Sequence, residues 1–194
     1  MDASEWDDRY RSADRLWSVT PNIFVADRLR DARPGRGVDL AAGEGRNAIW
    51  LASQGWEMTA VDFSDVAIAR GVGQAGDAVH FVVADVLEWE PEAGFDLVLV
   101  AYLQLGAREL ERVIRRSREW LDPGGELFLV GHDVSNLESG WGGPPHPEIL
   151  WDVPVLLGWL EGLRVIESGV VRRPVETEDG VRFARDALVR VRSS

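Results

Sequence analysis

The chain contains no cysteine and no lysine. Without thiols it can form neither a disulfide framework nor a thiolate metal site, and a cysteine nucleophile is excluded. Without lysine, a catalytic Tyr–Lys pair is excluded as well. A chain without disulfides fits a reducing compartment, so we expect a cytoplasmic protein. We also expect no bound metal.

Long apolar segments are also missing. No apolar run approaches the ~18 residues of a membrane-spanning helix, and residues 1–20 carry many charges where a signal peptide would be apolar. The formal net charge of −12 disfavours anionic partners, so we expect neither nucleic acid nor a membrane as a partner. A chain of 194 residues is long enough for one domain with its own core. We expect a monomer or a homodimer.

Short apolar runs alternate with helical patterns from residue 37 onwards, which is typical of βαβ units. Two helices precede the first strand, and Ser64 caps a further short helix inside the alternation. The strands are expected at 37–41, 56–62, 79–83, 95–100 and 126–130, with turn residues at 122–125. The helices are expected at 4–10, 22–30, 44–54 and 107–121. The short helix after Ser64 contains residues 66–68, and a loop is expected at 71–76.

The pattern changes after residue 132. Residues 133–147 are rich in Gly, Pro, Ser and Asn, and such a long loop suggests a lid or substrate loop. Residues 150–160 show a helical pattern that Pro154 should break or kink. Two strands are expected at 163–171 and 181–191, joined by a polar turn. The predicted fold is therefore α/β: a Rossmann-like, doubly wound sheet of seven strands, mostly parallel, with an antiparallel C-terminal strand.

We expect a single domain over residues 1–194 with four parts that differ in composition. These parts are an N-terminal helical cover at 1–33, a ligand-binding core at 34–132, a lid or substrate region at 133–160, and a C-terminal strand pair at 161–194.

Three carboxylates follow three consecutive predicted strands. Asp39 ends the first strand, Asp62 ends the second, and Asp85 follows the third. Ligands of open α/β sheets bind outside the carboxyl ends of the strands. One such aspartate would be read as a helix cap or turn residue, but the three together predict a ligand site.

The segment from Gly43 to Ala48 matches the dinucleotide-binding fingerprint, and Asp62 follows Gly43 by 19 residues. A dinucleotide needs positive potential where its pyrophosphate meets the loop. Asp39 and Glu44 lie there instead, and they favour a ligand that carries an ammonium and a sulfonium. An NAD(P)-dependent oxidoreductase stays open as the alternative.

Residues 39–47, 62–64, 84–86, 95–100 and 121–125 resemble, in order and spacing, the successive motifs of class I methyltransferases that depend on S-adenosylmethionine (SAM). More narrowly, the chain is similar to small bacterial methyltransferases of the tellurite-resistance and thiopurine-methyltransferase-like kind. The narrower similarity rests on Gly-Glu-Gly-Arg-Asn at 43–47, on the aromatic residues ahead of Pro21-Asn22, and on Glu178-Asp179-Gly180. One departure is Ala41, because the family usually carries glycine there.

The resemblance implies SAM as cofactor and S-adenosylhomocysteine (SAH) as product. Asp39 would face the cation, Asp62 would accept the ribose hydroxyls, and Asp85 would accept the adenine amino group beside Val86. The leading helix and residues 17–22 would fold over the cofactor. The implied cofactor-binding residues are Asp39, Ala41, Gly43, Gly45, Arg46, Asn47, Asp62, Phe63, Asp85, Val86 and Ala101.

Methyl transfer from a sulfonium is an in-line displacement, so the protein mainly positions the two partners and excludes water. A base is needed only when the acceptor must lose a proton. The candidates are His132, because a neutral imidazole suits proton removal near neutral pH, and Asp133. The resemblance places Tyr102 near the transferred methyl group. The alternative for His132 is a hydrogen bond to loop backbone, and for Tyr102 it is packing under the loop.

Trp141, Trp151 and Trp159 suggest an apolar, aromatic-lined pocket, which favours a small aromatic or apolar acceptor. Arg172 and Arg173 are either an anion-binding pair or solvent-exposed. A non-catalytic SAM-binding module is a further alternative, because no base is mandatory. A methyltransferase acting on nucleic acid is disfavoured by the acidity and by the sequence Ala-Tyr-Leu-Gln at 101–104.

Overall fold

The computed structural model describes residues 3–12 and 18–194, which fall into two compact units, 1–99 and 100–194. The strands form a seven-stranded sheet in the order β3-β2-β1-β4-β5-β7-β6. Strands β1, β2 and β3 pair in parallel, whereas β7 is antiparallel to both β5 and β6. The predicted Rossmann-like α/β fold with an antiparallel C-terminal strand is therefore confirmed. The single domain over 1–194 stays a prediction.

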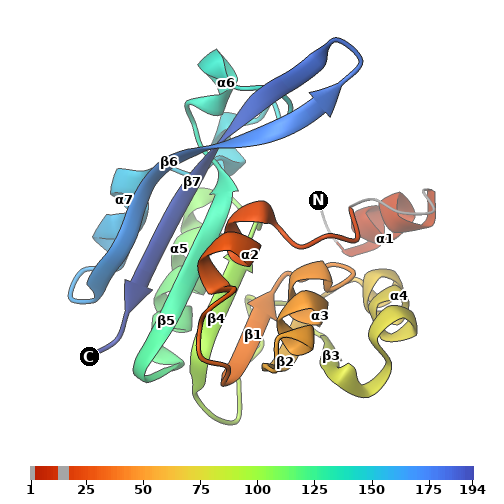
Figure 1. Ribbon diagram of the computed structural model, residues 1–194, viewed down its shortest axis with the longest axis vertical. Coiled ribbons are helices and arrows are strands. Elements are labelled where there is room, and N and C mark those ends of the chain that lie inside the picture. Colours follow the sequence, from red (N-terminus) through yellow and green to blue (C-terminus); the bar gives the residue numbers. More distant parts are fainter. Residues whose placement is uncertain (1–2, 13–17) are drawn as a thin grey trace. The chain divides into compact units, whose positions relative to one another are not determined.

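The first unit contains the parallel strands and the helices that cover them (Figure 1). Its core consists of the apolar faces of β1 to β3, which pack against α3 and α4, and α1 lies against α4. Its elements are α1 (Ala3–Ser12), α2 (Ile23–Leu29), β1 (Arg36–Leu40), α3 (Arg46–Ser53), β2 (Glu57–Asp62), α4 (Asp65–Ala75), a 3-10 turn (Gly76–Ala78) and β3 (Val79–Val83), and β4 (Phe95–Ala101) begins here.

Two predicted helix caps of the first unit are confirmed. The Asn22 side chain accepts hydrogen bonds from the backbone N–H groups of Phe24 and Val25, and Ser64 accepts one from Ala67. These bonds satisfy N–H groups that the first helical turn leaves without a partner. Helices α2 and α4 therefore begin within a residue of the predicted positions. The loop expected at 71–76 is wrong, because α4 continues to Ala75.

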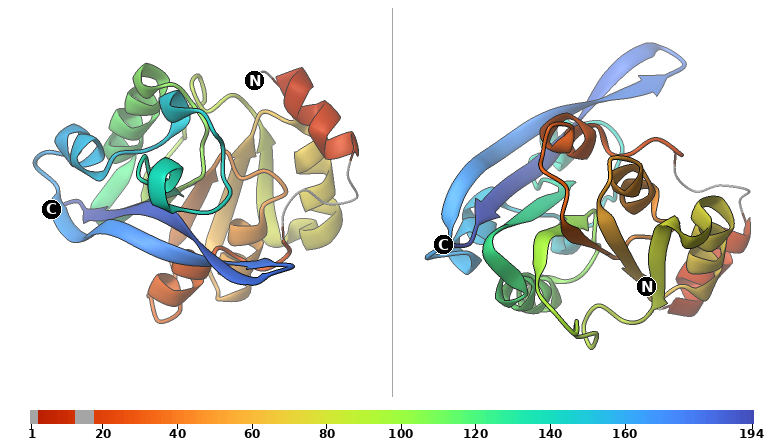
Figure 2. Two further views of the ribbon diagram at one scale, coloured as in Figure 1. Left: turned by 90° about the horizontal axis from the view of Figure 1, so that it is seen from above. Right: turned by 60° about the horizontal axis from the view of Figure 1, so that its bottom comes forward.

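The second unit contains the antiparallel strands and three helices. Helices α5 and α7 contact each other (Figure 2), and α6 contacts β7. The four fully buried residues Leu127–Val130 of β5 form the centre of its core. Its elements are α5 (Ala107–Glu119), β5 (Leu121–His132), α6 (Asn136–Ser139), a 3-10 turn (Pro147–Ile149), α7 (Val153–Trp159), β6 (Arg164–Thr177) and β7 (Gly180–Arg192).

Several predicted boundaries of the second unit are wrong. The turn expected at 122–125 is part of β5, and a short helix, α6, interrupts the predicted loop 133–147. Pro154 does not break the helix around it, because it lies in the first turn of α7, where no N–H partner is lost.

The C-terminal hairpin is longer than predicted. Strand β6 continues to Thr177 and turns into β7 through Glu178 and Asp179 alone. Polar residues hide this extension in the sequence, because only residues 186–192 of β7 pair with β5, and the outer part of the hairpin pairs with itself.

Within the described residues, 3–12 and 18–194, no helix has the length and apolar character needed to cross a lipid bilayer.

Candidate functional site

The loop between β1 and α3 is built from left-handed backbone. Ala41, Gly43 and Gly45 have φ values of 55°, 58° and 76°. Glycine adopts this conformation without strain, whereas in alanine the Cβ comes too close to the backbone. A Cβ on Gly45 would also lie 2.7 Å from the ring of Phe81. The predicted glycine loop is therefore a tight backbone turn that ends at the first residue of α3.

Asp39 carries a buried carboxylate with an unsatisfied oxygen. The residue is 1% exposed, and among the described residues its Oδ2 has no hydrogen-bond partner. Burial raises the pKa of Asp39 to about 7, against the opposing effect of the Arg46 charge and a backbone hydrogen bond from Ala48. An unsatisfied buried carboxylate oxygen is costly, so this position suits a ligand that supplies a cation or a donor.

Glu44 does not add the free negative charge that the sequence suggested. Its Oε1 lies 3.1 Å from Nη1 of Arg70 on α4, and the residue is 8% exposed. Because this ion pair compensates the charge of Glu44, the preference for a cationic ligand rests on Asp39 alone.

Asp62 ties the end of β2 to the glycine loop. Its Oδ2 accepts a hydrogen bond from Gly43 N at 2.8 Å, and its Oδ1 accepts one from Ser64 N at 2.9 Å. Burial raises its pKa in spite of these two bonds. Each carboxylate oxygen keeps a second lone pair, so Asp62 can still accept from a further donor such as a ribose hydroxyl.

Two predicted cofactor residues of α3 are engaged by the protein itself. The Asn47 side chain accepts a hydrogen bond from Asn22 N at 2.8 Å, so it anchors the start of α2. Nη1 of Arg46 lies 3.1 Å from the Ser18 hydroxyl. Ser18, Ala42, Glu44 and Arg46 also line a small cavity of about 20 Å³. The predicted cover over 17–22 begins at Trp17, which lies outside the described residues.

Asp85 lies in a turn after β3. Its Oδ1 accepts a hydrogen bond from Leu87 N at 2.8 Å, and the residue is exposed. Val86 beside it is buried, whereas Phe63 and Ala101 are half-buried. Asp39 and Asp62 influence each other electrostatically, but Asp85 has the hydrogen bond of a turn residue.

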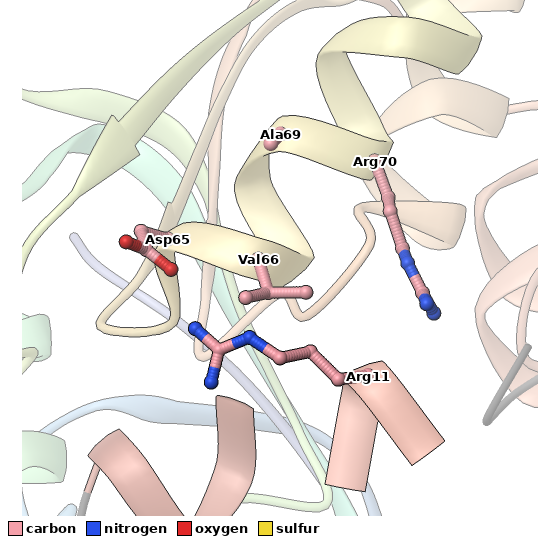
Figure 3. A pocket seen from close by; sticks show the side chains of 5 residues that line it. All are labelled: Arg11, Asp65, Val66, Ala69 and Arg70. Atoms are coloured by element: carbon pink, nitrogen blue, oxygen red, sulfur yellow. The ribbon is translucent and has the colours of Figure 1, made fainter. Parts of the chain in front are cut away.

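A shallow depression of about 630 Å³ lies between α1 and α4 and contains none of the predicted site residues. Figure 3 shows the Arg11 side chain reaching from α1 along α4 towards Val66 and Asp65. Arg11 also pairs with Asp8 of its own helix at 3.1 Å. The depression is a surface feature of this helix pair.

A polar cluster in the second unit brings the predicted catalytic residues Tyr102 and His132 together with Arg173 and Asp186. Asp186 is fully buried, and its Oδ2 accepts hydrogen bonds from the Tyr102 hydroxyl at 2.6 Å and from Arg173 Nε at 2.7 Å. Its Oδ1 lies 3.3 Å from His132 Nδ1, but the two atoms do not make a hydrogen bond, and neither has another hydrogen-bond partner among the described residues. The pairing register explains the assembly, because His132 lies opposite Asp186 and Arg173 lies opposite Ala184, two residues along the same face.

The cluster holds Asp186 ionised and Tyr102 protonated. Burial acts to raise the pKa of Asp186, but the interactions with His132, Arg173 and Tyr102 lower it below its ordinary value. The pKa of Tyr102 is raised by burial and by the nearby Asp186 charge. Tyr102 also has a left-handed φ of 58°, a strained conformation for a non-glycine residue. Its hydroxyl therefore donates to Asp186 and cannot serve as a base near neutral pH.

The third predicted catalytic residue, Asp133, supports a turn. It is 3% exposed, and its Oδ1 accepts hydrogen bonds from the backbone N–H and the hydroxyl of Ser135. Trp151 is core rather than pocket wall, because it is 1% exposed and donates to Leu103 O. Trp141, in contrast, is 47% exposed with the Arg182 guanidinium over its ring.

Sequence reasoning missed Asp186 altogether. Asp186 is the one carboxylate in the predicted strand 181–191, which is a usable signal, since a charge on a strand that packs against the core is rarely buried without partners.

Comparison with known proteins shows a similarity that runs from the first unit into the second. Residues 38–125 match a family model described as a methyltransferase domain. This part of the chain is similar to a methyltransferase domain. The predicted class I SAM-dependent methyltransferase fold is confirmed.

The chain is also similar to a curated relative and to solved structures. The chain is 32% identical over 125 residues to the ubiquinone/menaquinone biosynthesis C-methyltransferase UbiE of Acidiphilium cryptum, covering 60% of this chain and 48% of UbiE. The chain thus spans about half the length of this curated relative. The N-methyltransferase NodS from Bradyrhizobium japonicum, solved with SAH, has a TM-score of 0.75 and 19% identity, covering 99% of both chains. TehB from Haemophilus influenzae has a TM-score of 0.75 and 16% identity, covering 97% of this chain and 66% of TehB.

The described residues of the methyltransferase domain fit a ligand such as SAM. The unsatisfied Asp39 Oδ2 suits a cation, the left-handed loop allows close approach to the backbone, and Asp62 has lone pairs for a diol.

Proposed function

We propose that this chain transfers a methyl group from SAM to a small-molecule acceptor. The observation that carries the proposal is the buried, unsatisfied carboxylate oxygen of Asp39 beside the left-handed loop of a methyltransferase domain. When bound, SAM supplies a methyl group already activated by its sulfonium. The protein therefore needs to bind, orient and exclude water more than to provide acid or base chemistry.

The first unit would hold the cofactor. Asp39 is proposed to receive the cationic amino acid end, which pairs its free oxygen and returns the carboxyl to its ionised form. Asp62 would accept the ribose hydroxyls, and Asp85 would accept from the adenine amino group. The remaining contacts are assigned to Ala41, Gly43, Gly45, Arg46, Asn47, Phe63, Val86 and Ala101.

His132 is the proposed general base for an acceptor that must lose a proton. Asp186 is ionised and its Oδ1 lies 3.3 Å from Nδ1 without a hydrogen bond between them, so its negative charge favours a proton on Nδ1. Nε2 is then the atom left to take the acceptor's proton. Tyr102 is assigned a positioning role, since its hydroxyl is committed to Asp186. Asp133 is assigned to the turn that follows β5, and the exposed Trp141 supports an acceptor with an apolar or aromatic body.

Calorimetric titration with SAM, SAH and NADH tests the cofactor. We expect micromolar affinity for the two adenosyl ligands and none for NADH. Asp62→Ala should weaken SAH binding tenfold or more, because a hydrogen bond to a charged acceptor contributes about 1.5–3 kcal/mol. Circular dichroism must show that the variant is folded, since Gly43 N and Ser64 N also lose their acceptor. Binding of NADH alone would contradict the proposal and favour an oxidoreductase.

His132→Ala separates catalysis from cofactor binding. We expect nearly unchanged SAH affinity and, with an acceptor that must lose a proton, a loss of about 10²–10⁴-fold in kcat. His80→Ala is the matched control, because His80 lies on β3 and carries no proposed role. A large loss of SAH affinity in His132→Ala would instead place this ring in the cofactor site. SAH binding without turnover over a broad acceptor panel would favour a non-catalytic SAM-binding module.

A further inference from the structure

We propose that Arg173 binds an anionic group on the methyl acceptor, a carboxylate or a phosphate. This inference rests on the proposed function and narrows its acceptor class. The observation behind it is the way the guanidinium is held: one nitrogen is committed to the protein and the other two are not.

Nε of Arg173 is fixed from two sides. It lies 2.7 Å from Asp186 Oδ2 and 2.9 Å from the Tyr102 hydroxyl. Both partners are themselves held, because Asp186 is fully buried and Tyr102 is bonded to it at 2.6 Å. The plane of the guanidinium is therefore set before any ligand arrives, which reduces the entropy lost on binding.

The two terminal nitrogens of Arg173 are left for another acceptor. Within residues 3–12 and 18–194 they have no hydrogen-bond or ion-pair partner, and the side chain is 25% exposed. An arginine that pairs with a carboxylate to its full capacity usually does so with two parallel bonds. Here Asp186 takes only Nε, so the fork formed by Nη1 and Nη2 can bind a carboxylate or phosphate in that two-bond geometry.

The neighbouring Arg172 shows what an uncommitted surface arginine does in the same strand. It is exposed, it lies opposite Arg185 on the other face of the hairpin, and its guanidinium lies 4.1 Å from the ring centroid of Phe183. Successive side chains of a strand point to opposite faces, so Arg173 contacts the buried Asp186 whereas Arg172 lies exposed on the other face of the hairpin. Arg172 also supplies the matched control.

The other groups around Arg173 make a carboxylate or phosphate a ligand of moderate affinity. Asp186 already compensates one positive charge, while Tyr102 is neutral and His132 lies 4.9 Å from the Tyr102 ring, centroid to centroid. The site thus recognises an anion through geometry rather than through excess charge, so the neutral amide of the same shape is the informative competitor.

The test is calorimetric titration of the SAH-saturated protein with three probes that share a phenyl ring: benzoate, its neutral isostere benzamide, and phenyl phosphate. We expect benzoate or phenyl phosphate to bind at least tenfold more tightly than benzamide. The better of the two identifies the anionic group. Arg173→Gln and Arg173→Lys should both lose about tenfold in affinity for that anion, and Arg172→Gln should stay within twofold. Arg173→Lys keeps a cation beside the buried Asp186, so it tests the proposal even if Arg173→Gln does not fold.

The outcomes separate the two proposals. Absence of SAH binding overturns the proposed function before any anion is added. With SAH bound, equal affinity for benzoate and benzamide, no binding of either anion, or full affinity in Arg173→Lys overturns the assignment of Arg173 and leaves the methyltransferase proposal standing.

Discussion

Each unit of the chain contains a fully buried aspartate on a strand, Asp39 and Asp186, and the pKa values of the two shift in opposite directions. Asp39 of β1 has an oxygen without a hydrogen-bond partner among the described residues, and burial raises its pKa to about 7. Asp186 of β7 is buried to the same degree and its Oδ1 also lacks a hydrogen bond among these residues, but Tyr102 and Arg173 donate to its Oδ2, His132 Nδ1 lies 3.3 Å from its Oδ1, and its pKa is lowered.

The comparison shows that partners, rather than burial, decide what a buried carboxylate does. Desolvation penalises the ionised form of both residues. Donors offset this penalty at Asp186, which becomes a fixed anion that orders its neighbours. At Asp39 the penalty is only partly offset, and the remaining free energy is available to a ligand that supplies the missing partner.

Asp186→Ala should give the largest effect. It leaves the Tyr102 hydroxyl without its acceptor and the buried Arg173 guanidinium without its anion, so we expect the free energy of unfolding to fall by about 3–5 kcal/mol. Urea denaturation at pH 7 measures this. Asp179→Ala, in the exposed hairpin turn, is the control and should change stability by less than about 0.5 kcal/mol. A loss below about 1 kcal/mol for Asp186→Ala would mean that its partners find other acceptors.

Asp39→Asn should raise the free energy of unfolding, and the size of the increase should depend on pH. Because the pKa of Asp39 is about 7 in the folded chain and 3.8 ordinarily, the folded state holds more protons between these values, and stability falls as pH rises through that window. The neutral variant escapes this loss, so at pH 8 we expect it to be more stable than the wild type by up to about 4 kcal/mol. At pH 4 the difference should vanish.

The same variant tests the ligand assignment. Asp39→Asn should lose SAH affinity at pH 8 although it is more stable there. In the wild type, SAH affinity should fall as pH drops below about 7, because Asp39 must ionise to receive a cation. Wild-type SAH affinity that is constant from pH 6 to pH 8 would contradict the role given to Asp39.

The smallest effect concerns two non-glycine residues with left-handed backbone, which are the two of this kind in the described part of the chain: Ala41, φ 55°, and Tyr102, φ 58°. Tyr102 makes a hydrogen bond in that conformation, whereas Ala41 has only a methyl group to place. Ala41→Gly should therefore raise the free energy of unfolding by about 0.5–1 kcal/mol, measured by urea denaturation. Ala42→Gly, next to it but without a positive φ, should lower it by a similar amount. Equal signs for the two variants would show that Ala41 is unstrained.

Periodicity and capping chemistry predicted the parallel half of the sheet well. Strand β3 was predicted without error because it consists mostly of valine and phenylalanine, which favour strands, and Asn22 and Ser64 were recognised as caps because a cap is a local pattern. The antiparallel half was predicted less well. The outer hairpin mixes polar and apolar residues and does not pair with β5, and Pro154 was taken as a helix breaker because its position within the first turn of α7 is not visible in the sequence.

The sequence by itself determined the family of residues 38–125, the glycine loop, and the positions of Asp39 and Asp62 at strand ends, since all of these are set by order and spacing along the chain. Only the tertiary structure decided how charged each carboxylate is. The pairing of Glu44 with Arg70, the isolation of Asp39 Oδ2, and the cluster around Asp186 join residues far apart in sequence. The physical reason is that pKa and hydrogen-bond satisfaction depend on burial and on partners in space, which neither composition nor periodicity specifies.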